Sequence, residues 1–156
     1  MSDLARTVAE DLCAYYEMVH EQTHRWVDPL SDEQLWQQPF QHGNSIGHLL
    51  LHMTGNLNYY IGARVAGTGY IRDREREFTE SQRKTKAELL AAFDSVIAMV
   101  TETIGRQEPT GWLRAYSAER EPEAKERFNI FLRCAGHAYH HVGQIIYLAR
   151  EVMKAS

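Results

Sequence analysis

The chain has 156 residues and a net charge of −4, with 44% hydrophobic and 24% charged residues. This length fits one domain over residues 1–156 that buries about two-thirds of its unfolded surface without needing a disulfide or a structural metal. A net negative charge gives no positive surface potential to attract nucleic acid or an anionic membrane, so we expect neither as a partner.

Apolar residues recur at intervals of three and four, which predicts amphipathic helices and gives no sign of strands. The first helix covers about residues 4–27. A short turn follows, in which Ser31 and Gln34 can form a capping box. The second helix begins at Asn44 or Ser45, both good capping residues, and stops at the glycines Gly67 and Gly69.

Two connections separate the remaining helices. Residues 70–83 are charged and aperiodic, which predicts a surface crossover. Thr85 and Glu88 form a second capping box that opens a third helix, and Gly105 ends it. The last helix is expected over about residues 122–153, because proline suits a first turn. The sequence therefore predicts an all-α four-helix bundle with a long crossover connection between helices 2 and 3.

Neither a secretory signal nor a membrane span is visible in the sequence. No basic segment followed by an apolar run opens the chain, and apolar runs stop at five residues, whereas a span needs about 20. We therefore expect a cytoplasmic protein. Cys13 and Cys134 form no Cys-x-x-Cys pair, and we interpret them as small hydrophobic residues in a reducing compartment.

Histidines form the strongest pattern in the chain. Three pairs stand four residues apart, although chance placement of eight histidines would give fewer than one. Such a pair lies on one face of a helix and can bind one ion, and a third ligand then comes from a neighbouring helix of the bundle. The pairs are His20/His24, His48/His52 and His137/His141.

Helical periodicity separates these pairs. His137 and His141 share a row with apolar residues, so we expect both to point into the bundle. His52 lies beside the apolar stripe of the second helix, whereas His48 is rotated away from it. The periodicity therefore favours His52, His137 and His141 as the ligand set.

The other candidates carry weaker signals. His20 and His24 also lie on an apolar row, so periodicity does not exclude them, and supporting or boundary roles are the favoured interpretation. His42 fits a surface loop, and His140 faces outward or toward a neighbouring chain. Cys134, one turn before His137, could instead supply a thiolate.

Polar residues near the candidate ligands could support the site. Asn56 lies one turn beyond His52 and could hydrogen-bond a ligand or a substrate. Tyr139 and Gln144 flank the last pair, and Gln144 equally fits a solvated position. The mixed charges of residues 72–77 favour a solvated, self-compensating crossover over an arginine that binds a substrate carboxylate.

Three stretches together resemble the DinB-like (damage-inducible) metalloprotein superfamily. They are residues 44–56, 72–78 and 137–144, the last with the pattern His-x-x-x-His-x-Gly-Gln. The resemblance implies a four-helix bundle, often a homodimer, that holds a divalent metal through His52, His137 and His141. His48 departs from the pattern; as a fourth ligand it would close the site and make it structural rather than catalytic.

The resemblance also implies a chemistry. Three neutral histidines leave an open position for water or a thiol, whose pKa a metal lowers. Characterised members of the superfamily include transferases and isomerases that use low-molecular-weight thiols such as bacillithiol or mycothiol. We therefore expect a zinc or nickel enzyme with a small-molecule substrate, acting as a thiol-dependent S-transferase or a hydrolase.

Two other classes of function fit the same residues. One is a non-catalytic, stress-related dimeric bundle that stores or senses the ion. The other is a metal-free interaction bundle in which Gly136 and Gly143, on one side of the last helix with His140, allow close helix or subunit packing.

Overall fold

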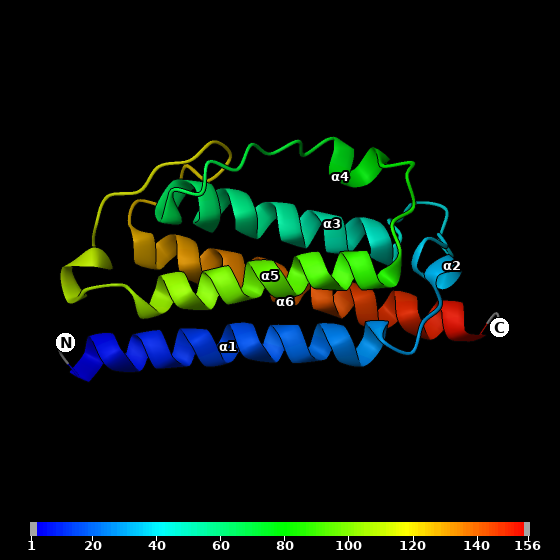
Figure 1. The fold of residues 1–156 in the computed structure, drawn as a ribbon, viewed down its shortest axis with the longest axis horizontal. Coiled ribbons are helices and arrows are strands. Elements are labelled where there is room, and N and C mark those ends of the chain that lie inside the picture. The colour runs from blue at the N-terminus through cyan, green and yellow to red at the C-terminus, as the bar shows by residue number, and fades with distance from the viewer. Residues whose placement is uncertain (1–2, 155–156) are drawn as a thin grey trace.

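Four long helices form an elongated bundle in the computed structural model, which describes residues 3–154 (Figure 1). The long helices are α1 (Asp3–Val27), α3 (Ile46–Leu57), α5 (Lys86–Gly105) and α6 (Arg127–Lys154). The short ones are α2 (Asp32–Leu35), α4 (Arg76–Thr79) and the 3-10 turn η2 (Pro109–Gly111). Over these described residues the only β-type pairing is one isolated bridge, so the all-α prediction is confirmed.

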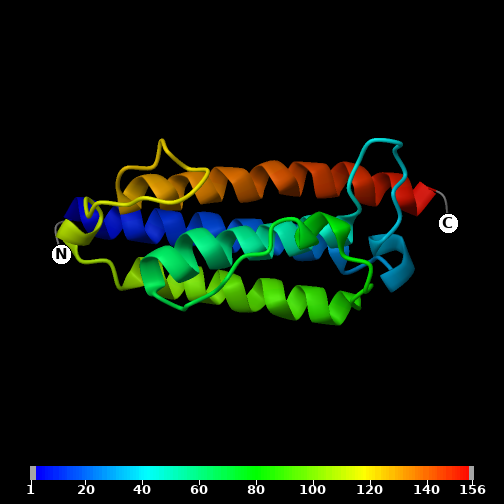
Figure 2. The same ribbon diagram turned by 90° about the horizontal axis from the view of Figure 1, so that it is seen from above.

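Each long helix packs against two others. Helix α1 contacts α5 and α6, and α3 contacts the same two helices from the opposite side. Figure 2 shows the consequence, with α5 and α6 on the two flanks and α1 and α3 between them. Helices α3 and α6, which carry the candidate ligands, are therefore neighbours.

Helix starts follow the predicted capping residues. Ser45 accepts a hydrogen bond from the backbone N–H of His48, and Thr85 and Glu88 form the complete capping box at the start of α5. The capping box of Ser31 and Gln34 is also present. These side chains satisfy backbone N–H groups that have no partner within their helix.

The second long helix changes its winding halfway along. After Leu57 it continues as a π-helix, η1 (Asn58–Ala66), which ends at Gly67 with a left-handed φ of 72°. Periodicity predicted the glycine stop but not the π-helix. Such wide turns often accompany functional sites, and this one begins two residues after Asn56.

The last helix begins later than predicted, at Arg127 rather than near Pro122. The backbone ahead of it pairs with the preceding connection: Tyr116 N–H donates to Lys125 O over 2.8 Å, and Arg127 N–H donates to Arg114 O over 3.1 Å. Because the Lys125 carbonyl accepts from Tyr116 instead of from an N–H four residues further along the chain, the helix begins after this residue. Gly105, expected to end the third helix, is the last helical residue of α5 and does not adopt a left-handed backbone conformation.

The crossover between η1 and α5 runs over the outer face of α3, and α4 contacts α3 there (Figure 1). No helix within residues 3–154 is long and apolar enough to cross a membrane.

Gly47 on α3 sets the spacing between this helix and Trp36. A Cβ atom at Gly47 would lie 2.8 Å from the Trp36 ring, which is buried and fixed by a hydrogen bond from its Nε1–H to Lys84 O. Gly47→Ala is expected to lower the free energy of unfolding by about 1–3 kcal/mol through overpacking. In urea titrations the matched variant Gly143→Ala, whose added Cβ meets open space, should be neutral or stabilising. Equal destabilisation of both would contradict this packing.

Candidate metal centre

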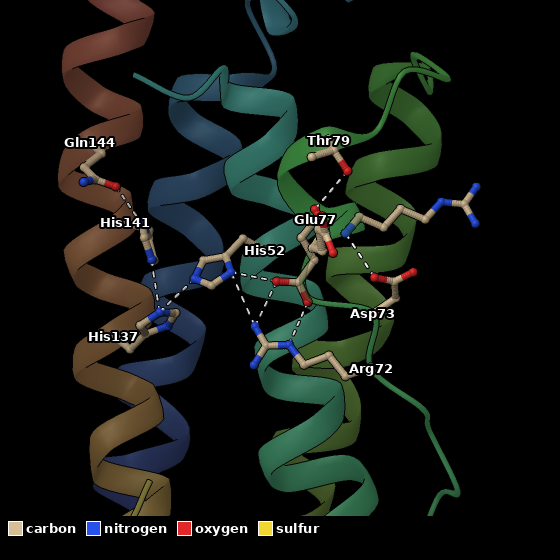
Figure 3. Close-up of polar contacts among 10 residues, drawn as sticks. His52, Arg72, Asp73, Glu77, Thr79, His137, His141 and Gln144 are labelled. Atoms are coloured by element: carbon tan, nitrogen blue, oxygen red, sulfur yellow. Dashed lines mark hydrogen bonds and ion pairs between the residues drawn. The ribbon is translucent and has the colours of Figure 1, made fainter. Parts of the chain in front are cut away.

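Three histidines from two helices converge at the candidate site. His52 comes from α3, and His137 and His141 come from α6 (Figure 3). The Nε2 atom of His137 lies 3.0 Å from Nε2 of His52 and 3.1 Å from Nε2 of His141. All three ligand atoms lie within 4.8 Å of one another. These are the three residues that periodicity favoured, and together they could hold a metal ion.

Outer hydrogen bonds fix which nitrogen of each ring faces the centre. His52 Nδ1–H donates to Glu77 Oε2 over 2.8 Å, and His141 Nδ1–H donates to Gln144 Oε1 over 2.7 Å. A neutral imidazole carries one proton, so both rings direct an Nε2 lone pair inward.

His137 cannot satisfy both of these lone pairs. One N–H at its Nε2 can donate to a single neighbour, and its own Nδ1 is buried with no hydrogen-bond partner among residues 3–154. A cation at the meeting point would accept all three lone pairs at once. The donor set and its orientation therefore fit a divalent metal.

The environment keeps His137 and His141 neutral. Burial, together with the neighbouring His141 and His52, lowers the pKa of His137 to about 3. Burial likewise lowers the pKa of His141 to about 4, against the opposing hydrogen bond to Gln144. Neutral imidazole is the form that binds metals, so neither ring needs to lose a proton near pH 7.

A buried carboxylate supports His52 from the crossover. Glu77 on α4 accepts hydrogen bonds from His52 and, over 2.7 and 2.9 Å, from Nε and Nη2 of Arg72. Burial alone would raise the pKa of Glu77, but the hydrogen bonds from His52 and Arg72 outweigh it and hold the pKa below its usual range. An ionised carboxylate behind a ligating imidazole orients the ring and increases its basicity.

This arrangement corrects the prediction of a fully solvated crossover. The side chains of Arg72 and Glu77 are only 8% and 6% exposed, and they pair with each other rather than with solvent. Arg72 therefore binds Glu77 in this structure instead of standing free for a substrate carboxylate.

The sequence pattern did not identify Glu77, although one signal for it exists. A Cβ atom at Gly55, three residues after His52, would lie 2.1 Å from Glu77 Oε1. Glycine at this helical position leaves room for the carboxylate to reach His52. A glycine inside an apolar helix, one turn from a candidate ligand, was the available indication of a close approach.

The predicted supporting residues differ in their positions. Asn56 is buried, and its Oδ1 has no hydrogen-bond partner within the described part of the chain. Gln144 bonds to His141, as described above. Tyr139 is 48% exposed and packs edge-to-face on Tyr15, so it lies outside the site.

The remaining histidines are not members of the converging group, although the His140 ring packs edge-to-face on His141. His48 uses Nδ1 to contact the Ser45 hydroxyl over 2.7 Å, and is not in the converging group. His20 contacts Asp94 on α5 instead, and His42 and His140 are exposed. Cys134 is buried, and burial raises the pKa of its thiol well above the usual range, which opposes the thiolate role.

A cavity of about 240 Å³ lies beside the histidines. Its lining contains His52, His137 and Asn56 together with three arginines and one glutamate. The glutamate, Glu121, is paired with Arg133 over 2.6 Å. The other lining residues are Tyr60, Arg72, Arg74, Arg120 and Glu121. The histidines thus lie beside a small cavity in which arginines outnumber glutamates.

Replacing Glu77 tests the supporting carboxylate. Glu77→Gln keeps the shape but removes the charge behind His52, and should weaken metal binding about 10–100-fold, measured by competition with a chelator. Glu75→Gln, on an exposed neighbour in the same charged run, serves as the control and should bind metal as the parent does. Identical affinities for both variants would contradict the role of Glu77.

Comparisons with known proteins place the chain. A structure described as "Crystal structure of the conserved protein of locus from Enterococcus faecalis" is similar, with a TM-score of 0.76 and 14% identity, over 93% of this chain and 96% of that one. This likeness concerns the fold. Curated proteins gave no match. The family model "Protein of unknown function (DUF1572)" matches residues 3–156, so the chain belongs to the DUF1572 family.

Proposed function

We propose that this protein is a metal-dependent enzyme of the DinB-like type that transfers a small thiol to an electrophilic substrate. The observation that carries the proposal is the convergence of three Nε2 atoms, from His52, His137 and His141, with two of the rings oriented by Glu77 and Gln144. Zinc and nickel both suit such a set of imidazole ligands.

The number of ligands supports catalysis over a structural or storage role. Structural zinc sites close with four protein ligands, whereas catalytic sites have three and leave a position open. Within residues 3–154 the group contains three histidines and no fourth protein ligand. When bound, the metal would lower the pKa of a thiol or water in the open position and so supply a nucleophile near neutral pH.

The free charges of the pocket favour an anionic partner. Arg72 is neutralised by Glu77, but Arg74 and Arg120 form no ion pair with any described residue. Arg74 lies over the Phe78 ring, with its guanidinium carbon 5.4 Å from the ring centroid. Arg120 has a left-handed backbone with φ of 68°, which is uncommon outside glycine and often found at functional sites. These two cations can bind a carboxylate, sulfonate or phosphate of the thiol or its acceptor.

Deprotonation of either nucleophile, thiol or water, would fall to the bound metal, and the preference for thiol transfer over hydrolysis rests on the resemblance to the DinB-like superfamily. The nearby carboxylates are engaged, since Glu77 pairs with Arg72 and Glu121 with Arg133. Neither is free to remove a proton from an attacking thiol or water. In thiol transfer the S–H proton would pass to solvent and the sulfur would form a bond to an electrophilic carbon, while the bond from that carbon to its leaving group breaks and the leaving group departs to solvent. The chain's own residues would then need only bind and orient the two reactants.

Metal content tests the ligand assignment. His137→Ala and His141→Ala should each lose about one tightly bound equivalent of zinc or nickel per chain, because two imidazoles leave an incomplete site. Elemental analysis after dialysis provides the measurement. His48→Ala is the matched control and should retain the metal, since His48 contacts Ser45 instead. Unchanged metal in His137→Ala and His141→Ala would overturn the proposal.

Thiol charge tests the pocket. In cobalt-loaded protein, mercaptoethanesulfonate should bind about 5–10-fold more tightly than mercaptoethanol, because its negatively charged sulfonate is attracted to the two arginines. The gain is modest because water partly screens this attraction. The thiolate-to-cobalt absorption band reports binding. Arg120→Gln should reduce this preference, while Arg114→Gln, on an exposed arginine outside the pocket, should preserve it. Equal affinity for both thiols would contradict an anion-selective pocket.

A further inference from the structure

A second group of metal-binding side chains lies on the other side of the bundle. His20 and His24 come from α1, and Asp94 comes from α5. Nε2 of His20 lies 2.8 Å from Asp94 Oδ1, and Nε2 of His24 lies 2.7 Å from the same oxygen. The three ligand atoms lie within 4.8 Å of one another. We propose that His20, His24 and Asp94 form a second divalent-metal site.

The contacts of His24 call for a positive charge at this point. Its Nδ1 lies 3.2 Å from Asp28 Oδ1 on one side, while its Nε2 lies 2.7 Å from Asp94 Oδ1 on the other. In the absence of a metal, a His24 ring protonated at both nitrogens donates to both carboxylates, and a divalent cation would take the place of the Nε2 proton. A metal ion there is held by Nε2, by Asp94 and by His20, with Asp28 as the carboxylate that orients the ligating imidazole.

Packing holds these ligands in place. The His20 ring stacks on Phe93, with centroids 6.2 Å apart and planes 13° from parallel, and Phe93 is fully buried. Asp94 follows Phe93 directly on α5, so the core contact that positions His20 also fixes the backbone of Asp94. The site therefore rests on two packed helices rather than on a loop.

The donor set defines the class of ion. Two imidazoles and one carboxylate suit zinc, nickel or ferrous iron, whereas magnesium and calcium prefer oxygen ligands throughout. The side chains of His20, His24 and Asp94 are 34%, 26% and 44% exposed, so solvent reaches the ion and can complete its coordination. Greater exposure should make this site weaker than the buried one.

This second site is independent of the proposed catalytic centre. The two groups share no residue and no helix, since His52, His137 and His141 lie on α3 and α6. Removal of either site should therefore leave the other able to bind, which allows the two proposals to succeed or fail separately.

Zinc titration of the full chain tests the proposal. Calorimetry or equilibrium dialysis of the unmodified protein should give about two equivalents of zinc per chain, one tighter than the other. His24→Ala should lose the weaker equivalent and keep the tighter one. Asp94→Asn, which preserves the shape of the side chain, should weaken that equivalent at least about 10-fold by removing its charged ligand.

Two controls complete the experiment. His42→Ala removes an exposed loop histidine and should keep both equivalents. His137→Ala should lose the tighter equivalent and keep the weaker one, so that failure of the buried site is distinguished from failure of this one. Two equivalents of zinc bound with unchanged affinity by both His24→Ala and Asp94→Asn, with helical circular dichroism unchanged, would overturn the proposal of a second site. The role of these residues would then be hydrogen bonding alone.

Discussion

The carboxylate of Glu77 is the interaction on which the candidate centre depends. It is almost completely buried, and an ionised group in such a position is stable only when donors surround it. His52 and Arg72 provide those donors, from α3 and from the crossover. One carboxylate thereby joins the crossover to the bundle, sets the tautomer of a ligand and neutralises one arginine of the pocket.

These contacts of Glu77 determine the arrangement of several other residues of the site. Because His52 donates through Nδ1, its Nε2 is available to the histidines of α6. Because Arg72 is bound to Glu77, the unpaired positive charge of the pocket comes from the exposed Arg74 and Arg120. The absence of a side chain at Gly55 makes the whole arrangement possible, since a Cβ atom there would overlap the carboxylate. The fold thus combines three histidines held by helices α3 and α6 with a neighbouring cavity lined by positively charged arginines.

The sequence predicted what depends on periodicity and on local capping. The long helices, the starts at Ser45 and Thr85 and the inward faces of His137 and His141 all follow from spacing along one element. The features it missed depend on contacts between elements. Glu77 lies in a charged run whose burial is decided by α3, and the late start of α6 depends on pairing with residues 112–116. The contacts of Asp94 with His20 and His24 join residues that are 74 and 70 positions apart in the chain.

The central claim is that His52, His137 and His141 hold a metal with a position left open. X-ray absorption spectroscopy at the zinc edge tests it most directly, using His24→Ala protein so that one site is observed. We expect three imidazole nitrogens at about 2.0–2.1 Å and at least one further light-atom ligand that is exchanged for sulfur at about 2.3 Å when a small thiol is added. A zinc environment with fewer than three imidazoles, or one closed by four protein ligands and unchanged by thiol, would contradict it.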